Sequence, residues 1–189
     1  MIGFLSERDL EKFGFKSVGV DVLISEKASI YEPEKMVFGN HVRIDDFCIL
    51  TGNIRIGDYV HIGSSSALYG KFGIDIGDFS GVSCRVILLS ATDDFTGEYL
   101  SNSPVIPQQY CKTTGGPITL KKFVNIGAGA IVFPDLVLAE GTAVGSMTLV
   151  NMNTREWSVY FGIPAKKIST RKKEMIKYAK LLKEDIRND

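Results

Sequence analysis

The chain has 189 residues, of which 44% are hydrophobic, a length and composition that suit a single domain over residues 1–189. Lysine plus arginine and aspartate plus glutamate number 22 each, so the net charge is zero and gives no support for nucleic acid as a partner. No apolar run approaches the roughly 20 residues of a membrane span, and the first residues lack the pattern of a signal peptide. We therefore expect no membrane insertion.

The three cysteines are odd in number and scattered along the chain. This usage favours reduced thiols and a cytoplasmic location. Cys48 and Cys84 fall in the repeat region described below, where we expect both as small residues of the core. Cys111 lies outside it.

Residues 1–19 predict an N-terminal helical cap. Ser6 is a suitable N-cap for a helix from Glu7 to Phe13, and Gly14 is suited to end it. A helix at the start of a repeat fold covers the apolar residues of the first coil, which would otherwise be exposed.

A six-residue repeat occupies residues 20–90 and 118–150. In the second block an aliphatic residue recurs at every sixth position: Leu120, Ile126, Val132, Leu138, Val144 and Val150. This period fits neither a helix nor an alternating strand, and it disfavours a β-sandwich. It is typical of a flat-sided coil whose sides are short strands, with three sides to a coil. Leu120 should therefore stack on Leu138, 18 positions later.

The first block keeps the same register with one exception. Ile56 and Ile76 are 20 positions apart rather than 18. We therefore expect a two-residue bulge at a corner near residues 71–73.

The repeats, together with the segments GAGAIV at 127–132 and FGIPAKKI at 161–168, resemble the hexapeptide-repeat acyltransferases, in particular the sugar and xenobiotic O-/N-acetyltransferases. The resemblance implies an all-β fold: a left-handed parallel β-helix with a protruding loop and a C-terminal α-helix. It also implies acetyl-CoA as co-substrate and a homotrimer with each active site between two subunits.

The repeat is interrupted at residues 91–117, which we interpret as an excursion loop. Long loops inside a domain are usually functional or disordered. The resemblance implies an ordered arm that reaches a neighbouring subunit, and a mobile surface loop is the alternative. Residues 151–189 should form an extended segment and a last helix, capped by Ser169 or Thr170, that runs to about Ile186 and packs along the coils or a neighbour.

The chain has two histidines, which are too few for the three-histidine zinc site of the related hexapeptide carbonic anhydrases, so we expect no metal. His41 should lie on the surface. His61 precedes a run of small residues, which suggests a shallow site where a ligand approaches the backbone. A solvent-facing histidine is the alternative.

In many acetyltransferases of the resembled family the general base is a histidine at the start of the excursion loop, where this chain has Asp93. In one interpretation Asp93 or Asp94 is the base, with the pKa of one raised by its neighbour and by partial burial. In the other, His61 is the base and the aspartates bind or orient the acceptor. In a third, activity has been lost. We expect a site built from His61, Asp93 and Asp94 together.

The resemblance also implies a binding surface for acetyl-CoA. Small residues near 127–130 and 145–146 would let the pantetheine arm lie close to the backbone. The expected contacts run from the pantetheine arm to the adenine and phosphates: Ala128, Ser146, Asn151, Met152, Pro164, Ala165 and Lys166.

The expected function is transfer of an acetyl group to a hydroxyl or amine of a sugar or sugar nucleotide, in bacterial surface polysaccharide biosynthesis. One alternative is a non-catalytic β-helix scaffold or binding protein, which the missing histidine at Asp93 favours. Another is a transferase that uses a larger acyl-CoA, such as succinyl-CoA.

Overall fold

The computed structural model describes residues 3–101 and 104–188. Residues 1–2, 102–103 and 189 belong to the expected cap, loop and C-terminal segment, and they lie outside the described residues.

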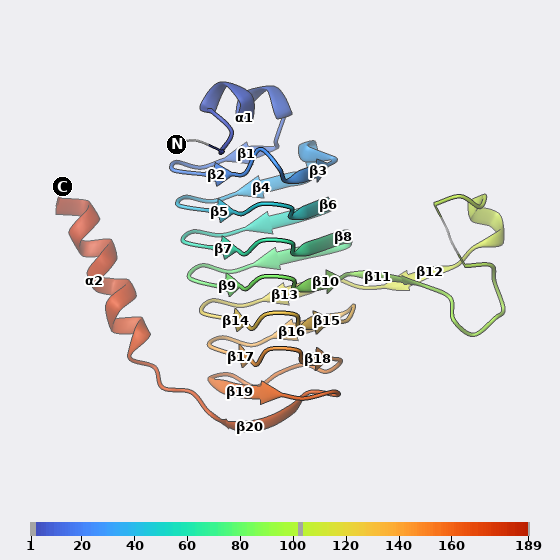
Figure 1. Ribbon diagram of the computed structural model, residues 1–189. Helices are drawn as coiled ribbons and strands as arrows, with labels where there is room; N and C mark the ends of the chain where they lie inside the picture. The colour runs from blue at the N-terminus through green and yellow to red at the C-terminus, as the bar shows by residue number, and fades with distance from the viewer. Residues whose placement is uncertain (1–2, 102–103, 189) are drawn as a thin grey trace.

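A stack of short parallel strands forms the body of the molecule (Figure 1). One sheet of the described chain follows a single side of the stack. Its strands are β2 (Leu23–Ile24), β5 (Arg43–Ile44), β7 (His61–Ile62), β9 (Gly81–Val82), β14 (Asn125–Ile126), β17 (Ala143–Val144), β19 (Ser158–Phe161) and β20 (Lys166–Thr170). The fold class predicted from the repeat is confirmed: the chain is a parallel β-solenoid with an α-helix at its C-terminal end.

A larger sheet contains two ladders that are joined through the long strands β6 and β8. Its strands are β1 (Ser17–Val18), β3 (Ser29–Tyr31), β4 (Met36–Phe38), β6 (Ile49–Ile56), β8 (Ala67–Ile76), β10 (Ile87–Leu89), β13 (Ile118–Leu120), β15 (Ile131–Val132), β16 (Leu136–Leu138) and β18 (Leu149–Val150). One ladder runs through β3, β10, β15 and β18, and the other through β1, β4, β13 and β16.

The coil-to-coil register follows the predicted spacing. Leu120 lies beside Leu138, as expected for residues 18 apart. Between β6 and β8 the register shifts after Gly52, so that Ile56 pairs with Ile76. The extra residues precede Ile74, which confirms the bulge predicted near residues 71–73.

Inward-facing aliphatic residues form one continuous core along the stack. Leu68 is at its centre: it is fully buried and lies in register with Leu50 and Leu88 on the two adjacent coils. Each coil therefore buries its apolar residues against its neighbours, as in other solenoids.

We expect Leu68→Ala to lower the free energy of unfolding by about 2–5 kcal/mol, because it leaves a cavity between two packed coils. Leu181→Ala is the matched control, since Leu181 is 42% exposed on the C-terminal helix, and should change stability by about 0.5 kcal/mol or less. Urea unfolding of both variants at one protein concentration measures the difference. Equal losses would contradict this description of the core.

The helical cap expected at the N-terminus is present as α1 (Glu7–Phe13). The N–H of Asp9 donates to Ser6 Oγ at 3.3 Å, and Gly14 ends the helix in the left-handed conformation. Leu10 of α1 packs into the core of the solenoid, so the helix covers the first coil.

The cap expected for the last helix is wrong. Ser169 and Thr170 lie in β20, where they pair with Val159 and Ser158 of β19, and α2 (Met175–Asn188) begins later. The antiparallel strand β20 covers the exposed edge of β19, the last rung. Residues that pair in this strand cannot at the same time cap a helix. Arg171 then fixes the chain, since its guanidinium donates to Phe123 O at 2.8 Å.

Helix α2 runs back beside the coils (Figure 1). Its Lys183 ammonium lies 5.2 Å from the centroid of the Phe79 ring. Phe79 belongs to a ladder of stacked rings along one corner, which starts with His41 on Tyr59. Within a single chain the apolar side chains of Leu182 and Ile186 on this helix stay exposed.

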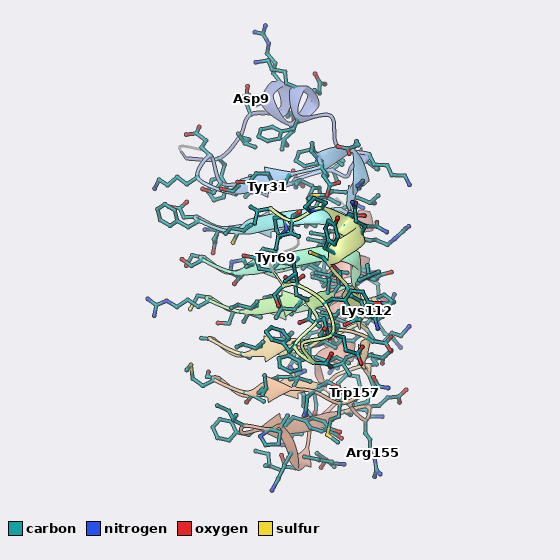
Figure 2. The ribbon with its side chains drawn as sticks, turned by 90° about the vertical axis from the view of Figure 1, so that its right-hand side faces the viewer. Asp9, Tyr31, Tyr69, Lys112, Arg155 and Trp157 are labelled. Carbon is teal, nitrogen blue, oxygen red and sulfur yellow. The ribbon has the colours of Figure 1, made fainter. Side chains whose placement is uncertain are left out.

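Residues 91–101 and 104–117 leave the body as a projecting arm (Figure 1). Its base is an antiparallel pair, β11 (Ala91–Asp93) with β12 (Thr113–Gly115), and it carries the short helix η2 (Gln108–Tyr110). Phe95 and Val105 on the arm are more than 80% exposed in the single chain. Figure 2 views the molecule along the arm, with Lys112 toward the reader.

Candidate active site

An open groove of about 510 Å³ lies on the outer surface of the β2–β20 sheet. It crosses β7, β9, β14 and β17 and the corner that follows these strands. The side chains of Asp45, His61, Cys84 and Asn125 line it. Glycines and serines make up much of the remaining wall, so the backbone of several coils is accessible there.

Three residues on successive coils form a column in this groove. His61 of β7 lies in register with Gly81 of β9, which lies in register with Asn125 of β14. Neighbouring strands are about 4.8 Å apart. Because Gly81 has no side chain, a gap separates the side chain of His61 from that of Asn125.

His61 is held by a carboxylate from the coil above. Its Nε2 lies 2.7 Å from Asp45 Oδ2, while Arg43 Nε donates to Asp45 Oδ1 at 2.7 Å. Burial raises the pKa of Asp45, but the hydrogen bonds from Arg43 and His61 outweigh it and leave the pKa below its ordinary value. An ionised carboxylate only accepts, so Nε2 carries the hydrogen and Nδ1 of the neutral ring remains able to take up a proton.

The two cysteines of the repeats differ. Cys48 is fully buried in the core, as predicted. The prediction is wrong for Cys84, which is partly exposed and lines the groove. The reason is register: Cys84 is a corner residue, stacked over Ala128 by the bond from Gly129 N–H to Cys84 O, at 3.0 Å.

Asp93 and Asp94 lie at the base of the arm and are not among the residues that line the groove of a single chain. Asp94 is buried, and its carboxylate accepts the hydroxyl and N–H of Thr96 and the N–H of Tyr99 at 2.8 to 3.1 Å. These hydrogen bonds, chiefly those from Thr96, lower the pKa of Asp94. The expectation that the pKa is raised is therefore wrong for Asp94. Its carboxylate instead holds the start of the arm through these hydrogen bonds.

The residues expected to bind CoA lie on the coils below the groove. Ala128 and Ser146 are corner residues beneath Cys84, joined by the bond from Met147 N–H to Ala128 O at 2.8 Å. Asn151, Met152, Pro164 and Lys166 are exposed farther along. Ala165 is different: it is 3% exposed and packs in the core, so its side chain supports the surface rather than forming it.

The glycines of this region have a packing role. A Cβ on Gly127 would lie 2.5 Å from the backbone nitrogen of Ser146 on the next coil. On Gly145 it would lie 2.3 Å from the ring of Phe161. Coil spacing therefore requires glycine at position 127, whereas at position 145 a side chain would displace the ring of Phe161.

Sequence reasoning missed Asp45, Cys84 and Asn125 as groove residues. The available signal was the register: each lies on an outward-facing or corner position within one or two coils of His61. Counting from the repeat, with the arm excluded, would have brought them together.

Within the described ranges, no helix is long and apolar enough to cross a membrane. In residues 3–101 and 104–188, groups of three or more His, Cys, Asp and Glu side chains placed to hold a metal ion are absent.

Comparison with known proteins gives close relatives. The chain is 41% identical to dTDP-4-amino-4,6-dideoxy-D-glucose acyltransferase of Escherichia coli over 185 residues, 96% of each chain. The chain is also 46% identical to AntD, an N-acyltransferase of Bacillus cereus, whose structure was solved in complex with dTDP and 3-hydroxybutyryl-CoA. The match covers 99% of this chain and 100% of AntD, with a TM-score of 0.95. Other AntD structures include a single-residue variant with dTDP-4-amino-4,6-dideoxyglucose and coenzyme A. No family model matches the chain.

A hexapeptide-repeat acetyltransferase of Vibrio cholerae shares the fold alone, with 18% identity, 86% of this chain and 75% of that chain covered, and a TM-score of 0.59. The solenoid, the groove and these relatives together define an acyltransferase. This chain belongs to the hexapeptide-repeat acyltransferases, the family that the sequence resembles, and it stands beside the dTDP-aminosugar acyltransferases within it.

Proposed function

We propose that this enzyme transfers an acyl group from acyl-CoA to the amine of a dTDP-linked 4-amino-4,6-dideoxy sugar. The observation that carries the proposal is the groove, where a histidine faces an accessible backbone above the expected CoA path. Two relatives support this choice of acceptor. One is named as an acyltransferase of such a sugar nucleotide, and the other was crystallised with one. We propose bacterial surface polysaccharide biosynthesis as the setting of this reaction.

The proposed chemistry is direct transfer. The acceptor amine attacks the thioester carbonyl, and His61 takes the amine proton at Nδ1. A carbon–nitrogen bond forms and the carbon–sulfur bond breaks. The CoA thiolate then receives the proton from His61, so the ring returns to its neutral form.

We propose that Asp93 and Asp94 act with His61 from the arm rather than as bases. Their position at the base of a projecting arm suits contact with a groove on a neighbouring copy. The bonds of Asp94 to Thr96 and Tyr99 would fix the arm for that contact. Asp93, which ends β11, would meet the acceptor.

CoA would extend from the groove over the small corner residues toward the C-terminal strands. Ala128 and Ser146 would line the pantetheine arm, with Asn151 and Met152 beyond it. Pro164, the main chain at Ala165 and the exposed Lys166 would meet the adenine and phosphates. Acetyl-CoA is the first donor to test. The AntD complex with 3-hydroxybutyryl-CoA favours a larger acyl group as the second candidate.

A homotrimer is part of the proposal, because one side of the solenoid is apolar on the outside. We call this the apolar face; Tyr31 and Tyr69 lie on it one above the other (Figure 2). Its outward residues are Tyr31, Ile49, Tyr69, Ile87, Leu89, Ile131, Phe133 and Leu149. Apolar surface that is continuous over several coils favours burial, and we assign its cover to two further copies of this chain. The three free cysteines agree with a cytoplasmic location.

A thiol-release assay tests the function. The purified protein is given acetyl-CoA or 3-hydroxybutyryl-CoA with dTDP-4-amino-4,6-dideoxyglucose, and with the corresponding sugar nucleotide that carries a hydroxyl instead of the amine as the control. We expect CoA release only with the amine, and the faster donor identifies the acyl group. Absence of acyl-CoA binding by calorimetry would overturn the proposal.

A further inference from the structure

The side-chain amide of Asn125 is held in one orientation. Its Oδ1 accepts a hydrogen bond from Arg171 Nη2 at 2.5 Å. Arg171 is itself fixed, since its Nη1 donates to the carbonyl oxygens of Phe123 and Gly141 at 2.8 and 3.2 Å. A guanidinium has donors and no acceptor, so the amide oxygen must face Arg171 and the amide nitrogen must face away from it.

The amide nitrogen of Asn125 lies over Gly81. A Cβ built on Gly81 would be 2.8 Å from Asn125 Nδ2, and apart from the atoms of Asn125 it would meet none within 4 Å. The imidazole of His61, on the other side of the gap, leans toward Asp45 instead. The amide nitrogen of Asn125 therefore covers Gly81 from one side, and the space that stays open lies between this N–H donor and the imidazole of His61 on the adjacent coil.

We propose that Asn125 is a catalytic residue: its Nδ2–H donates a hydrogen bond to the carbonyl oxygen of the acyl thioester, which lies over Gly81 between His61 and Asn125. This inference rests on the proposed function and assigns the oxyanion donor for it. When the amine attacks, the carbonyl electron pair moves to oxygen, and the N–H stabilises the resulting negative charge. The intermediate then collapses and expels the CoA thiolate, which takes the proton from His61.

Arg171 is a positioning residue in this arrangement. It touches neither substrate, but its bond to Oδ1 prevents the amide from turning its oxygen into the gap. A turned amide would present a lone pair to the developing oxyanion and would repel it. A donor fixed before the reaction is worth more than one that must rotate during it.

Asn125→Asp separates this role from a structural one. The carboxylate keeps the shape of the side chain and still accepts from Arg171, but it has no N–H to donate. We expect kcat to fall about 10²–10³-fold, as for loss of one oxyanion donor, with the KM for acyl-CoA changed less than about threefold and no loss of thermal stability. Asn153→Asp is the matched control, because Asn153 Oδ1 only accepts a bond, from Val137 N–H at 2.8 Å.

A spectroscopic measurement reads the same contact without turnover. Acetyl-CoA labelled with ¹³C at the carbonyl is bound to the enzyme without acceptor, and its carbonyl resonance is compared with that of free acetyl-CoA. We expect a downfield shift on the wild type and on Asn153→Asp that is lost on Asn125→Asp. Gly81→Ala should also lose it, since its methyl group fills the gap.

The outcomes are distinct. Equal carbonyl shifts in the wild type and Asn125→Asp, or an unchanged kcat in Asn125→Asp, would overturn this inference and leave the proposed function intact. Failure of the wild type to bind both acetyl-CoA and 3-hydroxybutyryl-CoA would overturn the proposed function itself, and this inference with it. A lowered melting temperature without a change in kcat would assign Asn125 a structural role only, which also contradicts the inference.

Discussion

Replacing His61 with alanine is expected to lower kcat by about 10²–10⁴-fold, the usual contribution of a positioned general base. The attacking amine must lose a proton, and in the proposed mechanism His61 Nδ1 accepts it, because Nε2 is engaged with Asp45. The fold should be unaffected, because the side chain of His61 is 54% exposed and exposed ion pairs contribute about 1 kcal/mol or less. Thiol-release kinetics with saturating acyl-CoA measure the loss.

His41→Ala is the control for this variant. His41 is the other histidine of the chain, and it also pairs with an aspartate, Asp21, at 3.2 Å, but it stacks on Tyr59 at a different corner. It should keep full turnover. Added imidazole should restore part of the activity of His61→Ala and none of that lost in Asn125→Asp. Full turnover in His61→Ala would refute its role, and Asp93→Asn would then be the variant to examine.

Ile87→Glu is expected to dissociate the proposed trimer and to abolish detectable turnover. Ile87 points outward from the middle of the apolar face, between Ala67 and Ile131 on the adjacent coils. In an assembly its glutamate would be buried in apolar surroundings without a partner, which costs several kcal/mol at each interface. Because the proposed site needs the arm of a second copy, a monomer should be inactive. Light scattering measures the mass against the 20.8 kDa chain.

Val137→Glu controls for the added charge. Val137 also points outward from a strand and is 41% exposed, but it lies on another side of the solenoid, beside Thr119. It should leave mass and turnover unchanged. An active Ile87→Glu monomer would show that one chain holds a complete site. If Val137→Glu dissociated instead, the interface would lie on the side of Val137 and the proposed apolar face would be wrong.

The fold was predictable because each coil of a solenoid repeats the same pattern of inward and outward residues, so the period of the sequence reveals the geometry. One aliphatic residue in six must face inward on every coil, so the pairing of Leu120 with Leu138 followed from counting alone. The bulge near residue 72 was found in the same way. The C-terminal strand was not, since Ser169 and Thr170 suit a helix cap by residue type, and their antiparallel pairing with β19, the strand just before them, falls outside the six-residue period.

The site was predictable only in part. His61 carried a signal of its own, because it precedes a run of small residues. Asp45 and Asn125 carried no signal by residue type, and only counting the register along the repeat brings them beside His61. Cys84 was misplaced by residue type, although its position relative to Val86, which fills the inward position, indicates a corner. The pKa of Asp94 is lowered by its hydrogen bonds to Thr96, and these bonds could not be read from the sequence.

Gly81 and Asn125 are 44 positions apart in sequence yet occupy adjacent rungs. The arm that separates them is thus inserted without changing the distance between the two rungs. In the proposed site, variation of the arm would alter what the enzyme acylates, while the spacing from His61 to Asn125 stays set by backbone hydrogen bonds. In this proposal the choice of acceptor and the acyl-transfer chemistry depend on different segments of the chain. Proteins of this fold could therefore take different sugars while His61, Gly81 and Asn125 keep their arrangement.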